Sequence, residues 1–121
     1  MCMVNMMVVG GREFKVAEVK QKYMLNIIDA AQKCDIIDRI VLFGSSIEDR
    51  CTESSDIDIA VFGRHTRSRA LSSKKYDRFT MQLYSFDDHN QGYDILYFKN
   101  GSTVDSSIIE DIKKGEVIYE R

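Results

Sequence analysis

The sequence predicts an α/β fold, in which helices pack against a small β-sheet. Short apolar runs of strand length alternate with longer segments whose apolar residues recur every three or four positions. Glycines and short polar turns separate these segments, and the chain contains no proline. Its 121 residues, 44% hydrophobic and 30% charged, are typical of a single globular domain (residues 1–121).

The N-terminal part predicts an apolar arm followed by a long helix. Residues 1–11 are apolar and end in Gly10-Gly11, so they form either a short strand or a frayed arm ahead of a core at residues 12–121. From about Arg12 to Cys34 the spacing predicts one amphipathic helix. Its expected buried stripe consists of Val16, Tyr23, Met24, Ile27, Ile28 and Ala31.

Three apolar runs predict strands. The run Arg39–Phe43 ends at Gly44 and leads into a short helix expected at Ser45–Cys51. A second strand, Asp56–Phe62, alternates with a period of two, which places its acidic residues on one face and its isoleucines on the other. The run Tyr93–Phe98 predicts the third strand.

The remaining segments predict two helices and a closing strand. Helices are expected at Leu71–Tyr84 and at about Val104–Lys114, and a short strand at Val117–Tyr119. Asp105 near the start of the second helix and two lysines near its end suit the helix dipole, and Gly115 ends it.

Three carboxylates on predicted strands point to a metal site. Asp56 and Asp58 lie two residues apart on a strand and therefore project from the same face. Carboxylates so placed repel one another unless a cation lies between them, and Mg²⁺ prefers oxygen ligands. If the strand of Asp94 lies alongside, three donors can hold two metal ions for phosphoryl or nucleotidyl transfer. The alternative for this pair is a solvated strand start.

A glycine turn before these acids suits a phosphate. Gly44-Ser45-Ser46 lies where a strand turns into a predicted helix, and backbone N–H groups at a helix start favour an anion. Gly44 has no Cβ, so a phosphate can approach the backbone, and Ser45 or Ser46 can add a hydroxyl. The segment is not a Walker P-loop, because no Gly-Lys-Ser/Thr follows at the required spacing. A plain strand-ending turn is the alternative.

These residues carry a resemblance to a known family. A Gly-Ser pair, ten intervening residues, Asp-x-Asp and a later strand carboxylate resemble the nucleotidyltransferase superfamily related to DNA polymerase beta, most closely its minimal nucleotidyltransferase (MNT) group. The ending Ile108–Tyr119 is also similar to the end of such domains, and the resemblance covers Ile40–Tyr119.

The resemblance implies a nucleotidyltransferase fold, a small mixed β-sheet packed by α-helices. It implies that Asp56, Asp58 and Asp94 are catalytic and bind two Mg²⁺ ions, with Asp94 helping to deprotonate the attacking hydroxyl. Gly44, Ser45 and Ser46 would bind the triphosphate. The implied reaction transfers a nucleoside monophosphate, most often AMP from ATP. Many MNT proteins are antitoxins of helical HEPN ribonucleases, and some adenylylate a tyrosine of that toxin.

One position departs from the family. Many relatives carry a basic residue two to four positions after the glycine, where this chain has Ser46, Ile47 and Glu48. The first basic residue is Arg50, which we assign to nucleotide binding on the hypothesis that it reaches back toward the phosphates. The departure also leaves a second hypothesis open: a non-catalytic antitoxin or nucleotide-binding module that neutralises a HEPN-type partner by binding. A glycosyltransferase with Asp-x-Asp fits less well, because that fold needs a longer chain.

Composition limits the remaining options. The net charge of −2 argues against direct nucleic-acid binding, and no apolar run is long enough for a membrane span. Three cysteines without close pairing and the lack of a signal-peptide pattern predict a cytoplasmic protein. The basic stretch at residues 64–78 is expected to be a solvated helix face, with contact to an acidic partner or RNA as the alternative. The apolar start leaves a homo-oligomer possible.

Overall fold

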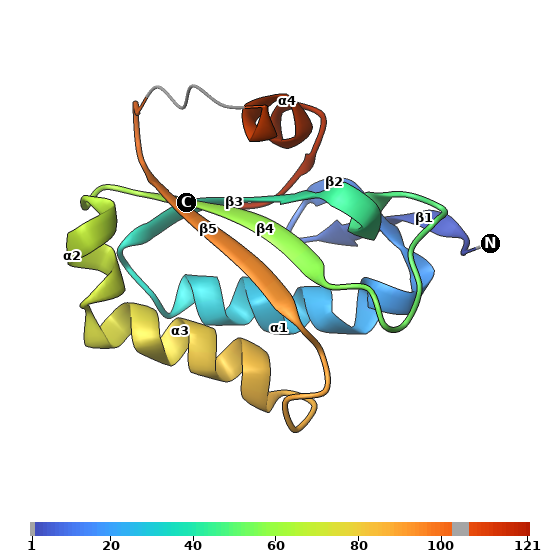
Figure 1. Cartoon of the computed structure of the whole chain (residues 1–121), viewed down its shortest axis with the longest axis horizontal. Coiled ribbons are helices and arrows are strands. Elements are labelled where there is room, and N and C mark those ends of the chain that lie inside the picture. Colours follow the sequence, from blue (N-terminus) through green and yellow to red (C-terminus); the bar gives the residue numbers. More distant parts are fainter. Residues whose placement is uncertain (1, 103–106) are drawn as a thin grey trace.

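The computed structural model describes residues 2–102 and 107–121 and has helices on both faces of a mixed β-sheet (Figure 1). This confirms the predicted fold class. In chain order the elements are β1 (Val4–Val9), β2 (Arg12–Ala17), the 3₁₀ turn η1 (Glu18–Lys20), α1 (Gln21–Gln32), β3 (Ile37–Phe43), the 3₁₀ turn η2 (Gly44–Ile47), β4 (Ile57–Gly63), α2 (Arg67–Leu71), α3 (Lys74–Ser85), β5 (Tyr93–Lys99), α4 (Ile108–Lys113) and β6 (Glu116–Glu120).

The main sheet has the strand order β5-β4-β3-β6. Strand β3 runs antiparallel to both β4 and β6, whereas β4 and β5 are parallel and are connected through α2 and α3. Parallel neighbours need such a crossover. As a result, the starts of β4 and β5 lie side by side at one end of the sheet, next to the end of β3.

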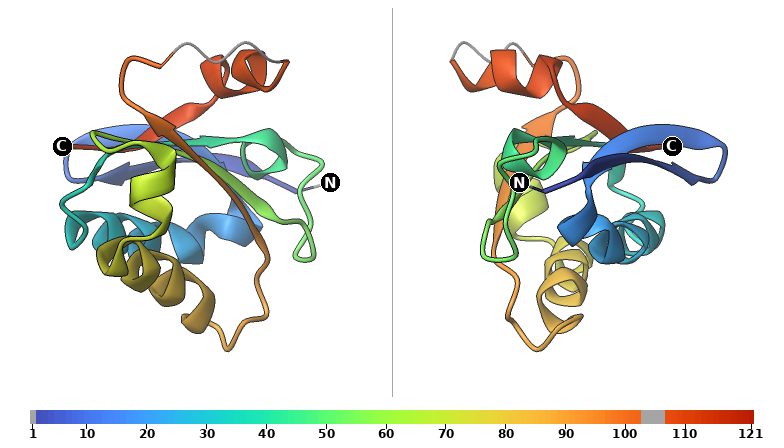
Figure 2. Two further views of the ribbon diagram at one scale, coloured as in Figure 1. Left: turned by 60° about the vertical axis from the view of Figure 1, so that its left-hand side comes forward. Right: turned by 90° about the vertical axis from the view of Figure 1, so that its right-hand side faces the viewer.

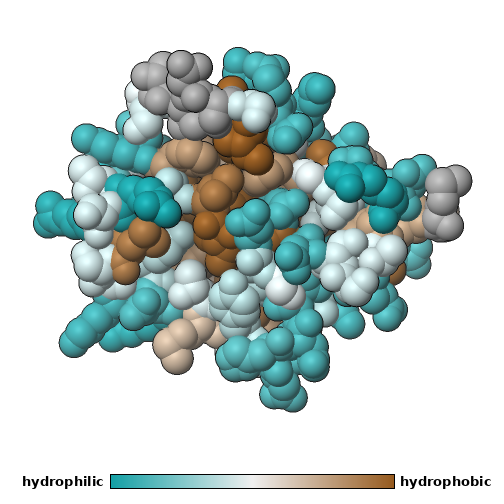
Figure 3. All heavy atoms as spheres, in the orientation of Figure 1, coloured by the Kyte–Doolittle hydropathy of each residue, from teal (hydrophilic) through white to brown (hydrophobic). Residues whose placement is uncertain are grey.

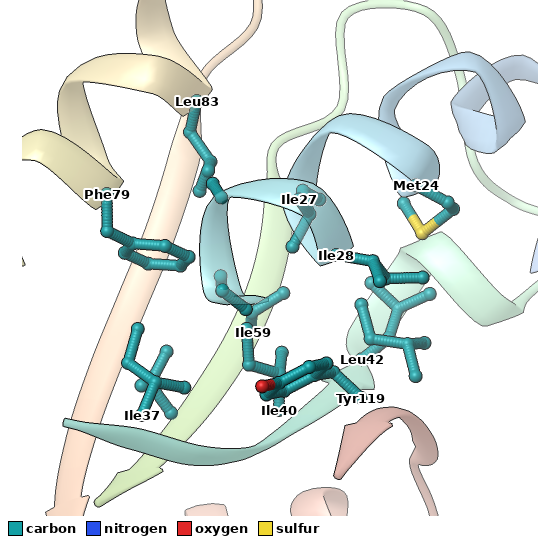
Figure 4. Close-up of a cluster of buried hydrophobic side chains, with 14 of the residues drawn as sticks. Met24, Ile27, Ile28, Ile37, Ile40, Leu42, Ile59, Phe79, Leu83 and Tyr119 are labelled. Carbon is teal, nitrogen blue, oxygen red and sulfur yellow. The ribbon is translucent and has the colours of Figure 1, made fainter. Parts of the chain in front are cut away.

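Helices α1 and α3 cover one face of the sheet, and α4 lies on the opposite side (Figure 2). The face toward α1 and α3 carries the larger core, in which side chains of α1, β3, β4 and α3 meet, as Figure 4 shows for Ile27, Ile40, Ile59, Phe79 and Leu83. All five are at most 1% exposed. Burying one such side chain stabilises a fold by about 1.5–3 kcal/mol, so this core fixes how the helices pack on the sheet.

The second face carries a smaller apolar cluster. Ala60 of β4 packs there with Val41, Phe43 and Ile112, and the partly buried Phe62 joins them. Ile57, Ile59 and Val61 belong to the core on the other face. The predicted alternation of β4 is therefore confirmed.

The predicted helix at Arg12–Cys34 is wrong in its first part, because residues 12–17 form strand β2 of a hairpin with β1. Gly10 and Gly11 both have positive φ (59° and 80°), as a two-residue hairpin turn requires. Phe14 and Val16 are fully buried while Glu13 and Lys15 are exposed, which is the period of a strand. Residues 4–9 are thus a strand rather than a frayed arm, and the boundary at residue 11 falls inside the hairpin turn.

Other predicted helices are shorter than expected. The helix expected at Leu71–Tyr84 begins only at Lys74, as α3, because α2 ends at Leu71. The Ser73 hydroxyl caps α3 by accepting a hydrogen bond from the backbone N–H of Lys75. The helix expected at Ser45–Cys51 is only the turn η2. Helix α4 begins at Ile108, and the expected start at residues 104–106 lies outside the described residues.

Figure 3 shows apolar side chains gathered over the middle of β5, below α4, with hydrophilic side chains around them. Phe62 of β4 and Phe98 of β5 stack with their ring centroids 5.4 Å apart, and the Arg39 guanidinium lies 4.3 Å from the centre of the Phe62 ring. In the parts of the chain that the structure describes, no helix combines the length and apolar character needed to cross a membrane.

Candidate active site

The parallel pairing of β4 and β5 brings two of the predicted acids together. Asp58 and Asp94 are register partners, so their side chains leave adjacent strands on the same face of the sheet. Asp56 directly precedes β4, on the same side of the strand in the alternating pattern. The predicted juxtaposition of carboxylates from neighbouring strands therefore holds for Asp58 and Asp94, with Asp56 one step away.

The glycine turn lies against this pair. Phe43, the last residue of β3, is the register partner of Asp58, so the following residue, Gly44, is placed beside the Asp58 side chain. Gly44 has a φ of +71°, which L-amino acids with a side chain rarely adopt. A Cβ at this position would overlap Oδ2 of Asp58. The backbone conformation therefore favours glycine here, and a side chain at this position would also displace the Asp58 carboxylate.

A second glycine supports the other acid of the Asp-x-Asp pair. A Cβ added to Gly92 would overlap Oδ1 of Asp56. The backbone N–H of Ile57, between the two acids, donates to the carbonyl of Gly92 at 3.0 Å. The sequence reasoning missed Gly92, although its position one residue before the third strand was a usable signal.

The three carboxylates influence one another electrostatically. The pKa of Asp58 is raised to about 6, first because burial penalises the charged form and then because Asp94 and Asp56 add negative charge. Arg50 acts in the opposite direction and lowers the pKa. In the described part of the chain, no salt bridge involves Asp56, Asp58 or Asp94. A cation is the group that would relieve this repulsion.

The donor set suits a hard divalent cation, because it consists of carboxylate oxygens. Its present arrangement is open: among residues 2–102 and 107–121, no group of three or more His, Cys, Asp or Glu side chains is arranged to hold a metal ion. Asp58 is directed at the Gly44 turn and Asp56 at Gly92. By chemistry the residues fit Mg²⁺, and their side chains would have to turn toward one another to share it.

The predicted phosphate cradle is less helical than expected. Because η2 is a four-residue 3₁₀ turn, it contributes little of the dipole that a full helix would provide. The features that remain are Gly44, which is half-buried and has no side chain, and the half-buried Ser45. The Ser46 hydroxyl is buried and has no hydrogen-bond partner among the described residues.

Arg50 lies within electrostatic reach of the acids but is engaged elsewhere. Its Nε is 2.8 Å from Oε2 of Glu48, and the Arg50 side chain is exposed. An exposed pair of this kind is worth about 0.2–1 kcal/mol. A bound phosphate could therefore compete with Glu48 for the guanidinium.

The fold and the site together define an α/β domain of the nucleotidyltransferase type. A family model described as "Polymerase beta, Nucleotidyltransferase" matches residues 25–121, and the chain therefore belongs to this nucleotidyltransferase family. This confirms the superfamily inferred from the Gly-Ser and Asp-x-Asp pattern. The match begins inside α1, after the β1–β2 hairpin. Comparison with curated proteins gives no match.

Proposed function

We propose that this chain is a Mg²⁺-dependent nucleotidyltransferase that transfers a nucleoside monophosphate, AMP from ATP, to a hydroxyl acceptor. The observation that supports it most is the register pairing of Asp58 with Asp94, beside a Gly44 turn whose positive φ favours glycine. Membership of the nucleotidyltransferase family supports the reaction class. The nucleotide, the metal and the acceptor are the proposal's own additions.

In this mechanism the chain's residues mainly position the reactants and bind the ions that neutralise their charge. Asp56, Asp58 and Asp94 would hold Mg²⁺, which supplies charge neutralisation at the reacting phosphate when it is bound. Gly44 and Ser45 receive the triphosphate beside Asp58, with Ser46 and Arg50 as further predicted contacts. Asp94, the most open of the facing pair, accepts the proton of the acceptor hydroxyl. The acceptor oxygen bonds to the α-phosphorus as the bond to pyrophosphate breaks, and pyrophosphate leaves with that electron pair.

The acceptor we propose is a tyrosine of a HEPN-type partner protein, on the basis of the MNT resemblance. Phosphoryl-transfer catalysis is largely positioning and electrostatics, so removing one charge has a large effect. With α-labelled ATP, Mg²⁺ and such a partner, Asp56→Asn should transfer label about 10³-fold more slowly, equivalent to about 4 kcal/mol of barrier. Asp111→Asn removes a charge from the exposed surface of α4 and is the matched control.

Unlabelled ATP, GTP, CTP and UTP added as competitors identify the base. No transfer to any hydroxyl acceptor by the wild-type protein, or equal transfer by wild type and Asp56→Asn, would refute the enzymatic proposal.

A second function is favoured by two observations: the open arrangement of the acids and the pairing of Arg50 with Glu48. In this alternative the chain neutralises a HEPN-type partner by binding, without chemistry. Neutralisation that survives the double replacement Asp56→Asn and Asp58→Asn supports the binding module. Neutralisation lost in a double variant that still binds the partner supports the enzyme.

A further inference from the structure

A lysine is buried behind the loops that lead to the acids. Lys20, at the end of η1, is 0% exposed, although lysine is almost never fully buried without partners. Its Nζ donates to the carbonyl of Glu53 at 3.0 Å and to Oε1 of Gln91 at 2.6 Å. One partner precedes β4 and the other precedes β5, so Lys20 bridges the two segments that deliver Asp56 and Asp94.

Gln91 completes the bridge. This side chain is 3% exposed, and its Nε2 donates to the carbonyls of Ser55, at 2.9 Å, and Gly92, at 2.6 Å. Ser55 is the residue before Asp56, and Gly92 stands two residues before Asp94. With Oε1 receiving Lys20 and Nε2 facing two carbonyls, only one orientation of the amide satisfies all of its partners.

The hydrogen bonds of Gln91 lie next to the backbone that holds the acids in place. The amide N–H of Ile57 donates to the Gly92 carbonyl, the same oxygen that Gln91 approaches. Gly92 in turn packs against the Asp56 carboxylate. The chain Lys20–Gln91–Gly92 therefore extends from the buried ammonium to one of the acids through direct contacts.

We propose that Lys20 and Gln91 are positioning residues, which clamp the Glu53–Ser55 loop to Gln91-Gly92 and thereby set the spacing of Asp56, Asp58 and Asp94 for a divalent cation. The inference rests on the proposed function for the identity of the ligand. The hydrogen bonds that form the clamp do not depend on that function. Lys20 lies before residue 25, outside the segment that the family model matches. The clamp is thus a contribution of the N-terminal region to the site.

Two nearly isosteric substitutions test the clamp. Lys20→Met keeps the aliphatic stem and removes the donors, and Gln91→Glu places a carboxylate oxygen against two carbonyls. Residues that orient metal ligands typically change metal affinity by about 10- to 100-fold when replaced. We expect Mn²⁺, added alone and followed by electron paramagnetic resonance, to bind both variants at least about 10-fold more weakly than wild type.

The controls separate positioning from charge and from stability. Lys22→Met removes the same charge two residues away at an exposed site, and Ile37→Val weakens the core at the opposite end of β3. Both should bind Mn²⁺ as wild type does. Removal of a positive charge by itself favours cation binding, so charge alone does not explain weaker binding by Lys20→Met. If Lys22→Met weakens binding as much as Lys20→Met, the effect is not specific to the clamp and the inference is wrong. If Ile37→Val does so, the effect is one of general stability, and the inference is equally wrong.

Amide hydrogen exchange at Ile57 reports on the clamp without any ligand. Exchange of this N–H should accelerate in Lys20→Met and Gln91→Glu, and not in the controls. Unchanged exchange in both variants overturns the inference. If wild type binds no Mn²⁺ but Ile57 exchange accelerates as expected, the clamp between the loops stands, whereas its role toward a cation and the metal-dependent proposed function are both refuted.

Discussion

One face of the sheet contains a buried apolar region and, next to it, an open charged region. In the middle of β4, Ala60 is buried with Ile112 of α4, beside its register partner Leu96. Two residues earlier on the same strands, Asp58 and Asp94 occupy equivalent positions on the same face. The strand pair is therefore continuous, while the environment changes from apolar and covered to charged and open within about 7 Å.

This difference shows how the fold accommodates the clustered carboxylates without a large loss of stability. Charged groups that lose water without a partner cost several kcal/mol, so the acids can stand only where the covering helix ends. The Gly44 turn keeps that end accessible, because a larger residue would fill the space beside Asp58. The residues that stabilise the fold and the candidate site residues thus lie at different positions of the same strands, not on different elements.

Moving a carboxylate two residues along β4 should have the largest effect. Ala60→Asp places a charge at a site that is 0% exposed, so we expect it to destabilise the fold by about 4 kcal/mol or more. Ala60→Val adds comparable volume without charge and should cost about 1–3 kcal/mol. Urea unfolding measures both. Equal costs for the two variants would show that space, not charge, distinguishes the ends of this face.

Closing the open end is the next test. In Gly44→Ala the new methyl group both strains a φ of +71° and displaces Asp58, so we expect about 2–3 kcal/mol of destabilisation and loss of transfer activity. Gly11→Ala is the matched control: its φ is +80°, but a Cβ there meets nothing within 4 Å. It should cost about 1 kcal/mol and leave activity intact. The difference between the two measures the steric contact with Asp58.

The negative charge of Asp58 should destabilise the folded protein at neutral pH. A pKa of about 6 for Asp58 in the folded protein, against its ordinary value of 3.8, means that the folded state binds the proton more tightly than the unfolded state. Stability from this group is therefore highest below pH 3.8 and falls as the pH rises through 6, by about 2 kcal/mol in total after allowance for solvent screening of the partly exposed Asp58. Asp29, Asp35 and Glu48, whose pKa values are lowered, change stability in the opposite direction.

The variant Asp58→Asn isolates this contribution. The difference in unfolding free energy between Asp58→Asn and wild type should move in favour of the variant as the pH rises from 4 to 7. A difference that is flat over this range would mean that Asp58 titrates normally in the folded protein. Mg²⁺ should reduce the penalty in wild type but not in the variant, which a titration at pH 7 would show.

The sequence predicted the strands that carry the acids because apolar runs and a period of two are local signals. It could not establish that Asp58 and Asp94 are side by side, since register depends on which strands pair and in which direction. That placement was a condition in the sequence argument, and the parallel pairing of β4 and β5 fulfils it. The sequence also could not show that the segment after Gly44 is a four-residue turn, because such a turn and a full helix begin alike.

The hairpin shows a different kind of failure. Of the apolar stripe that predicted the first helix, only Val16 lies before Gln21, so the evidence for a helix over residues 12–17 was a single residue. Gly10-Gly11 between two alternating runs was the stronger signal. Lys20 and Gln91 were missed for another reason: most of their partners are backbone carbonyls, which no sequence pattern reveals.

The smallest effect concerns the edge of the open end, where Glu48 holds Arg50. Glu48→Gln weakens this pair, so Arg50 becomes free to meet a phosphate, and we expect KM for ATP to fall about twofold to fourfold, in line with the value of exposed ion pairs. The free energy of unfolding should change by less than about 0.5 kcal/mol for the same reason. Glu110→Gln, which breaks an exposed Lys113–Glu110 pair on α4, is the matched control and should leave KM unchanged. A KM that rises in Glu48→Gln would mean that Glu48 orients Arg50 toward the nucleotide instead of withholding it, which would make the pair part of the site rather than a competitor for it.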